Sequence, residues 1–211
     1  MTKKIKLVDP SLEEKPLNLH PEILAILFEN RRLIKNAFLE VKGLYDIAYM
    51  GITIINPERQ VLVFSSIPSI EYNLIHQNLW QKDPCFAPSK QTDVFCWWNT
   101  QVDTIDLLKT QKIKLQNNQF TQGMTVTREL NNFYLLYSYA TGSEKQGLRD
   151  YYQTNIFGLL DIGDYFYKTI RELYSIYDLN YTSPQINHLA KKISNMKCNT
   201  KLRLVTNDEH I

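Results

Sequence analysis

Hydrophobic residues recur at helical spacing in the first part of the chain and then give way to β-branched runs. Over residues 19–41, apolar residues return at steps of three and four, which predicts an amphipathic helix that stops at Gly43. Residues 47–55 and 60–65 are rich in β-branched and aromatic residues, with a turn at Asn56-Pro57 between them. This pattern predicts an antiparallel hairpin.

The rest of the chain alternates helical and extended patterns in the same way. The spacing predicts helices over residues 68–79, 102–115 and 147–177, and strands over residues 94–98, 123–127 and 133–139. Because the strands come mostly in hairpin pairs, the sheet is expected to be antiparallel. The predicted fold class is α/β: an α-β-α sandwich, similar to PAS and GAF domains, with a central antiparallel sheet of about five strands. Such a sheet commonly holds a small-molecule pocket against its helices.

Composition narrows the classes of protein that these elements can form. The 211 residues are 44% hydrophobic and 22% charged, which is typical of a globular chain with one sizeable core. The seven glycines are scattered and form neither a dinucleotide-binding fingerprint nor a phosphate-binding loop. A formal net charge of +2 gives no argument for a polyanionic partner. Aromatic residues reach 12%, enough to line a pocket as well as fill a core.

Cysteine content and the N-terminal sequence bear on the cellular compartment. Cys85, Cys96 and Cys198 include no C-x-x-C pair, which argues against a disulfide scaffold or a structural zinc site and suits a reducing compartment. The first residues lack the apolar core of a secretory signal, and no apolar stretch approaches the roughly 18 to 20 residues of a membrane span. We therefore expect a cytoplasmic protein that contacts no membrane and carries no cofactor.

The segment from Asp83 to Trp98 holds the most informative chemistry. A carboxylate ahead of Pro84 has a restricted backbone, and Trp97 and Trp98 each offer an apolar face and one indole N–H. These groups could orient a ligand that has a polar amide or lactone head and an apolar tail. The alternative interpretation is structural: Asp83 caps a turn and the tryptophans fill the core.

In order and spacing, these elements resemble the autoinducer-binding domain of LuxR-type quorum-sensing regulators over roughly residues 20–177. The residues that carry the resemblance are Ile47-Ala48-Tyr49, Asp83-Pro84, Phe95-Cys96-Trp97, Gly123-Met124-Thr125 and Leu136-Tyr137-Ser138-Tyr139. The resemblance implies an α/β/α sandwich that binds N-acyl-homoserine lactones in a cavity between sheet and helices. It implies a signal-sensing domain of a bacterial transcription regulator.

The resemblance also implies roles for single residues. Asp83 would accept the amide N–H of the ligand, Trp97 would donate to the lactone carbonyl, and Ser138 would lie near the acyl carbonyl. The expected ligand-binding residues are Tyr49, Tyr72, Asp83, Trp97, Trp98 and Ser138.

Two departures from the family pattern bear on the ligand. The helix before Asp83 normally carries a Trp and a Tyr that face the ligand, whereas here only Tyr72 lies near the expected place. A family glycine four residues before the one matching Gly123 is Gln119 here. These changes leave open a different small amphipathic ligand, or none.

The expected domain organisation is a flexible lead-in over residues 1–18, a sensor domain over 19–177 and an incomplete helix-turn-helix remnant over 178–211. The last 34 residues are too few for the three helices of a DNA-reading domain, so we expect no direct DNA binding. The partner would instead be a second copy, or a related regulator in a heterodimer that this chain modulates.

Two other classes of function compete with signal binding. A ligand-free interaction module or bacterial effector could retain the fold, and aromatic side chains filling the space beside Asp83 would favour it. A nucleophilic site could be drawn from Cys85 and His76, but it would require both side chains in one cleft. We expect no enzyme and no metal site, because His20, His188 and His210 lack ligand spacing.

Overall fold

The computed structural model describes residues 16–86, 95–99, 104–130 and 133–177. Its strands are β1 (Asn18–Leu19), β2 (Tyr49–Ile55), β3 (Gln60–Ser65), β4 (Phe95–Trp97), β5 (Gln122–Leu130) and β6 (Phe133–Thr141). Its α-helices are α1 (Ile23–Glu29), α2 (Arg31–Leu39), α3 (Pro68–His76), α5 (Ile105–Lys114), α6 (Leu148–Thr154) and α7 (Ile156–Tyr177). Short 3₁₀ turns lie at Leu44–Asp46, Trp80–Lys82, Pro84–Phe86 and Gln116–Asn118.

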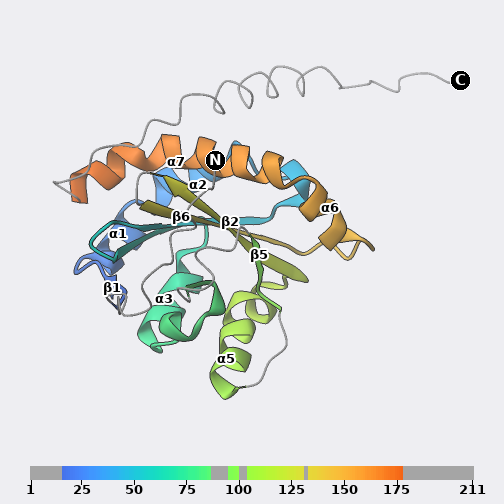
Figure 1. The fold of residues 1–211 in the computed structure, drawn as a ribbon, viewed down its shortest axis with the longest axis horizontal. Helices are drawn as coiled ribbons and strands as arrows, with labels where there is room; N and C mark the ends of the chain where they lie inside the picture. Colours follow the sequence, from blue (N-terminus) through green and yellow to red (C-terminus); the bar gives the residue numbers. More distant parts are fainter. Residues whose placement is uncertain (1–15, 87–94, 100–103, 131–132, 178–211) are drawn as a thin grey trace, which may run out of the picture.

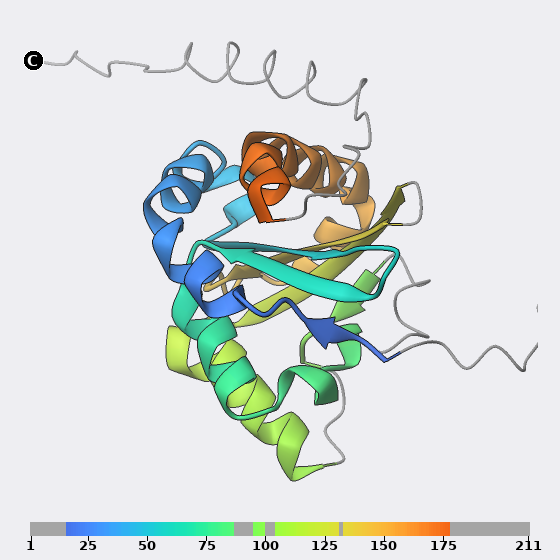
Figure 2. The ribbon, with the colours of Figure 1, turned by 90° about the vertical axis from the view of Figure 1, so that its left-hand side faces the viewer.

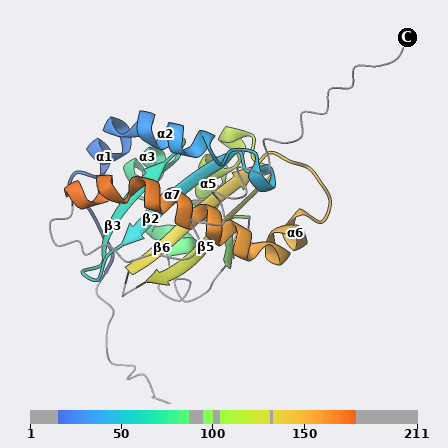
Figure 3. The same ribbon diagram turned by 90° about the horizontal axis from the view of Figure 1, so that it is seen from above.

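These elements form three layers, as the fold class predicted (Figure 1). Helices α2, α6 and α7 cover one face of the sheet, and α3 and α5 cover the other. Seen from above, α7 runs across the sheet beside α2 (Figure 3). The side view separates α7 from the α3–α5 pair by the full thickness of the sheet (Figure 2). The expected α-β-α sandwich is therefore confirmed.

The sheet has six described strands in the order β1-β3-β2-β6-β5-β4, one more than the five expected. All neighbours are antiparallel except β1, a two-residue strand that pairs parallel to β3, with Asn18 opposite Gln60. A run this short gives no alternating pattern, so hydrophobic periodicity could not find it. The other five strands were all predicted, with ends that differ by up to three residues.

Two helices that the pattern predicts as continuous are broken by asparagines. Asn30 separates α1 from α2, and Asn155 separates α6 from α7. In each case the side-chain amide donates to the backbone carbonyl four residues earlier, at 3.2 Å to Ile26 and 2.8 Å to Tyr151. A side chain that competes for backbone bonds in this way favours a helix end over a helix interior.

Alternation along the strands divides the core into two parts. Met50, Ile52 and Ile54 of β2 face the α7 layer, whereas Tyr49, Gly51 and Thr53 face the α3–α5 layer. The α7 side holds a dense aromatic and aliphatic core. The α3–α5 side holds a mixture of apolar and charged groups, and the candidate site lies there.

Residues 1–15 and 178–211, which include most of the expected lead-in and the whole expected helix-turn-helix remnant, lie outside the described residues. Among the helices that are described, none combines the length and the apolar character that crossing a bilayer requires.

Candidate ligand-binding site

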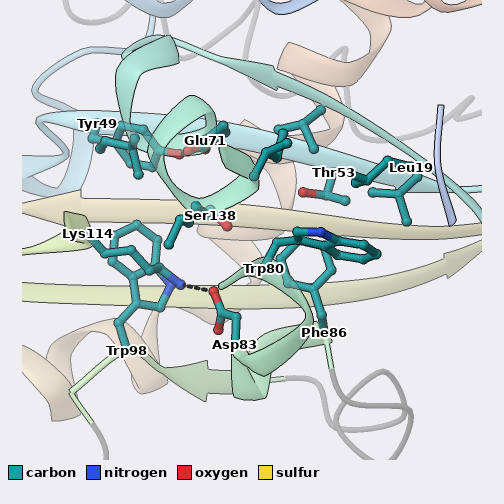
Figure 4. A pocket seen from close by; sticks show the side chains of 15 residues that line it. Leu19, Tyr49, Thr53, Glu71, Trp80, Asp83, Phe86, Trp98, Lys114 and Ser138 are labelled. Atoms are coloured by element: carbon teal, nitrogen blue, oxygen red, sulfur yellow. Dashed lines mark hydrogen bonds and ion pairs between the residues drawn. The ribbon is translucent and has the colours of Figure 1, made fainter. Parts of the chain in front are cut away.

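A small cavity lies between the sheet and the layer that contains α3 and α5 (Figure 4). Its volume is about 40 Å³. The strands contribute Leu19, Tyr49, Thr53, Val61, Val63 and Ser138, and the helices and turns contribute Ile70, Glu71, Leu74, Ile75, Trp80, Asp83, Phe86, Trp98 and Lys114. A cavity of this size accommodates a few water molecules rather than an acyl chain.

Asp83 and Lys114 form a buried ion pair in the cavity wall. The Lys114 Nζ donates to Asp83 Oδ2 at 2.7 Å, and both side chains are less than one-tenth exposed. Asp83 follows the Trp80–Lys82 turn, and its Oδ1 accepts the Cys85 backbone N–H at 3.0 Å. The carboxylate therefore caps a turn, as one interpretation of the sequence held, and also lines the cavity. Both of its oxygens are already bonded within the protein.

Lys114, the last residue of α5, remains a cation inside this layer. Burial is the largest single influence and lowers the pKa of Lys114, but the charge and hydrogen bond of Asp83, together with the neighbouring Cys85 and Cys96, more than offset it, so the pKa is raised. The ammonium also lies 4.1 Å from the centroid of the Trp98 ring, where a cation–π contact stabilises it. Within the described chain, Asp83 is the only hydrogen-bond acceptor that the ammonium uses.

Glu71 of α3 places a second carboxyl in the same cavity. Its Oε1 accepts a short hydrogen bond from the Tyr49 hydroxyl. Burial raises the pKa of Glu71 to about 7, and this effect exceeds the opposing influence of Tyr49, Lys114 and Ser65. The other oxygen, Oε2, is buried and has no hydrogen-bond partner of ordinary geometry among the described residues. An unsatisfied buried polar atom of this kind costs about 1 to 3 kcal/mol.

Two glycines make room for the aromatic side chains of the site. A Cβ on Gly51 would lie 2.5 Å from the Tyr49 hydroxyl, and a Cβ on Gly123 would lie 2.1 Å from the Trp98 ring. The Trp98 indole N–H donates to the Thr125 hydroxyl at 2.9 Å, and that hydroxyl lies 3.1 Å from Ser138 Oγ. Trp98 is thus held against the sheet at Gly123 and Thr125, close to Ser138.

The structure brings four of the six expected site residues together around the cavity. They are Tyr49, Asp83, Trp98 and Ser138. Tyr72 does not line it: its ring stacks on His76 with centroids 5.5 Å apart and meets Phe28 edge-on.

Trp97 does not line the cavity either, because side chains alternate along β4. Cys96 and Trp98 face the α3–α5 layer, and Trp97 faces the other side. There its ring is covered by the Arg149 guanidinium, 4.9 Å from the ring centroid. Trp97 is therefore outside the lining of this cavity, and Trp98 is the tryptophan that lines it together with Asp83 and Lys114.

Most of the lining was not among the expected site residues; the charged and bulky aromatic members of that part are Glu71, Trp80, Phe86 and Lys114. Charged residues on predicted amphipathic helices are ordinarily assigned to the solvent face, so Glu71 and Lys114 gave no signal. Lys114 meets Asp83 across 31 residues of sequence, a contact that no local pattern encodes. Trp80 and Phe86 pack edge-on at 6.2 Å between ring centroids and narrow the space beside Asp83.

The nucleophilic site drawn from Cys85 and His76 does not form. His76 is exposed and stacks on Tyr72, whereas Cys85 is buried with its Sγ 3.0 Å from Cys96 Sγ. The hydrogen bond between the Cys85 and Cys96 thiols, together with burial, raises the pKa of the Cys85 thiol well above its usual value. The reactive thiolate form is therefore disfavoured. In the described part of the chain, no three His, Cys, Asp or Glu side chains gather as metal ligands would.

The three-layer fold is similar to that of the autoinducer-binding domain of SdiA, a LuxR-type regulator. Among solved structures, the chain is similar to SdiA in complex with octanoyl-rac-glycerol. The sequences are 14% identical, the match covers 85% of this chain and 73% of that one, and the TM-score is 0.50. A second structure, Escherichia coli SdiA, is 14% identical over 83% of this chain and 79% of that one, with a TM-score of 0.48.

Two further comparisons gave no match. No protein-family profile matches the sequence, and no curated protein matches it. The likeness to SdiA is therefore one of fold.

Proposed function

We propose that this chain is a signal-binding domain that takes up a small amphipathic molecule between the sheet and the α3–α5 layer. The observation that carries the proposal is the two-part lining of the cavity. Asp83, Lys114 and Glu71 supply charged and polar groups, while aliphatic side chains such as Val63 and Leu74 supply the remaining wall. A site of this kind suits a ligand with a polar head and an apolar tail.

Binding of such a molecule requires the cavity to expand. At about 40 Å³ the cavity is far smaller than the roughly 300 Å³ or more of a typical ligand pocket. Trp80 and Phe86 are the bulky side chains that would have to move, and both come from short turns rather than from the sheet. We therefore expect ligand uptake to displace the Trp80–Lys82 and Pro84–Phe86 turns away from the sheet.

The engagement of both Asp83 oxygens bears on the ligand expected from the LuxR resemblance. An N-acyl-homoserine lactone whose amide N–H bonds Asp83 would have to share the carboxylate with Lys114 or the Cys85 N–H. A ligand that bonds other groups of the cavity meets no such competition. This comparison favours a small amphipathic signal other than an N-acyl-homoserine lactone.

A thermal-shift panel tests the proposal. Octanoyl-homoserine lactone and octanoyl-rac-glycerol are compared with their free head groups, homoserine lactone and glycerol. A bound amphiphile at 100 times its Kd is expected to raise the Tm by about 5 to 10 °C.

Two matched variants locate the site. Val63→Phe adds a ring inside the cavity and should abolish the shift. Leu108→Phe adds the same ring bulk on α5 at a side chain that is 57% exposed and outside the lining, and should leave the shift unchanged. Equal shifts in both variants would place binding elsewhere on the molecule.

A second function is favoured by one observation: Trp80 and Phe86 narrow the space beside Asp83, and Lys114 is paired with the Asp83 carboxylate. This arrangement suits a ligand-free interaction module that retains the fold. The same panel separates the two functions, because the ligand-free module would show no Tm shift with any amphiphile. In that case the Lys114–Asp83 ion pair would be a structural contact that takes the place of a ligand.

A further inference from the structure

One end of the cavity carries polar groups whose hydrogen-bonding capacity is not used. Figure 4 shows Glu71 and Tyr49 on one side of this end, with Lys114, Asp83 and Trp98 facing them. Each Asp83 oxygen already accepts one hydrogen bond, from the Lys114 ammonium or from the Cys85 N–H. Glu71 Oε2 is buried without a partner among the described residues. Lys114 carries three N–H bonds and uses one described acceptor.

The state of the Glu71 carboxyl restricts what could pair with it. Its pKa of about 7 means that the ionised and the protonated carboxyl both occur near neutral pH. An amide N–H or an ammonium can bond Oε2 only while that oxygen carries no proton, because such a group can donate but not accept. A hydroxyl group pairs with both forms, because it donates to a carboxylate and accepts from a carboxylic acid. A hydroxyl is therefore the group that satisfies Oε2 at any pH in this range.

Lys114 sets the second requirement. Its ammonium is fixed by Asp83 and by the face of Trp98, and its remaining N–H bonds require an acceptor. The carbonyl of an acyl ester or acyl amide supplies such an acceptor one bond away from the head group. The opposite end of the cavity, around Leu19, Thr53 and Phe86, offers mostly apolar surface to an acyl chain (Figure 4).

We propose that the site selects an acyl ester or amide whose head carries a free hydroxyl, with the hydroxyl bonded to Glu71 Oε2 and the acyl carbonyl accepting from Lys114. This inference rests on the proposed function and specifies its ligand class. Glu71 would bind the hydroxyl of the head group, Lys114 would bind the carbonyl of the ester or amide, and the apolar end of the cavity would hold the acyl chain. Asp83 positions Lys114 and does not itself contact the ligand.

Isothermal titration with five octanoyl or octyl probes tests this assignment. Octanoyl-rac-glycerol and N-octanoylethanolamine carry both the hydroxyl and the carbonyl. Methyl octanoate and N-methyloctanamide keep the carbonyl but lack the hydroxyl, and 1-O-octylglycerol keeps the hydroxyls but lacks the carbonyl. Each hydroxylated acyl probe is expected to bind about 10-fold tighter or more than its hydroxyl-free counterpart, and also tighter than the ether.

Two substitutions at one position supply the protein side of the test. Glu71→Met keeps the length of the side chain and removes its hydrogen bonding, so the preference for hydroxylated probes should fall to about one. Glu71→Gln retains a group that can bond a hydroxyl and should retain most of the preference. The probe series in the unaltered protein tests the assignment by itself, so the conclusion does not depend on whether the variants fold.

The outcomes distinguish this inference from the function on which it rests. If the probes bind with no head-group preference, or if Glu71→Met keeps the preference, the hydroxyl assignment is wrong and the signal-binding function stands. If the hydroxylated acyl probes and the ether bind equally tightly, the acyl carbonyl does not accept a hydrogen bond from Lys114, and that part of the assignment is wrong. If no probe binds, the proposed function itself is overturned, and the assignment falls with it.

Discussion

The buried Glu71 carboxyl predicts an unusual dependence of stability on pH. Its pKa is raised by burial from the ordinary 4.5 to about 7, so the folded protein holds a proton there that the unfolded chain has released. Stability contributed by this proton is complete below pH 4.5 and is lost as the pH rises to 7. Each pH unit in this window changes the free energy of unfolding by about 1.4 kcal/mol, which gives a loss of about 3 kcal/mol in all.

Glu71→Gln isolates this contribution because glutamine does not titrate and can still accept the Tyr49 hydrogen bond. Urea unfolding is measured for both proteins from pH 4.5 to 8. The stability of the glutamine variant relative to the unaltered protein should rise by about 3 kcal/mol across this range. The difference between the proteins is the relevant quantity, because burial also raises the pKa of Asp164 to about 6 and adds a loss of the same sign to both curves.

A difference that stays constant with pH would refute this reasoning. It would mean that the carboxyl of Glu71 titrates near its ordinary pKa and is not held in a desolvated site. The groups that face it are the Tyr49 hydroxyl on β2, the Ser65 hydroxyl on β3, the Lys114 ammonium on α5 and the Asp83 carboxylate in the turn. Such a result would therefore imply a wetter cavity or a closer approach of Lys114.

Three other predictions concern the walls of the same cavity. Lys114→Met should lower the free energy of unfolding in urea by about 3 to 5 kcal/mol, because it leaves the buried Asp83 carboxylate without its cation. Adding Asp83→Asn should recover part of that loss, and additive losses in the double variant would contradict the pairing. Gly123→Ala should cost about 1 to 3 kcal/mol and alter tryptophan fluorescence, because the new methyl group displaces the Trp98 ring; an unchanged spectrum and stability would contradict the close approach. Iodoacetamide should alkylate the Cys85 thiol at least about 10-fold more slowly in the folded protein than in urea, because both the burial and the raised pKa of the thiol disfavour its attack. Peptide mass mapping measures the two rates, and equal rates would contradict this prediction.

Hydrophobic periodicity was sufficient to predict the layers of this fold. The segments over residues 47–65 and 123–139 are rich in β-branched and aromatic residues and contain turns, and the structure has strand pairs in both places. The breaks at Asn30 and Asn155 were missed because an apolar stripe continues past them while a single side-chain hydrogen bond interrupts the helix. The strand at Asn18–Leu19 was missed because two residues carry no pattern.

The candidate site was predictable only where a motif anchored it. Tyr49, Asp83 and Ser138 belong to the segments that carry the resemblance, Trp98 directly follows one of them, and all four line the cavity. Trp97 was assigned to the same site as Trp98 because the sequence of two adjacent tryptophans does not indicate which ring faces which side of the sheet.

The charged groups Glu71 and Lys114 could not have been found from sequence, for a physical reason. Their burial depends on partners 22 and 31 residues away, and a helical pattern assigns isolated charges to solvent. They are also the residues that make this cavity unlike a purely apolar one.

The central claim, that a small amphipathic molecule enters the cavity between the sheet and the α3–α5 layer, is tested most directly by the three tryptophan indole N–H signals in a ¹⁵N-edited NMR spectrum. Trp80 and Trp98 line the cavity, and Trp97 lies on the opposite face of the sheet under Arg149. Assigned through single Trp→Phe variants and titrated with octanoyl-rac-glycerol, the Trp80 and Trp98 signals should shift with a common saturation while the Trp97 signal stays in place. No shift at any of the three, or a shift confined to Trp97, would contradict the account.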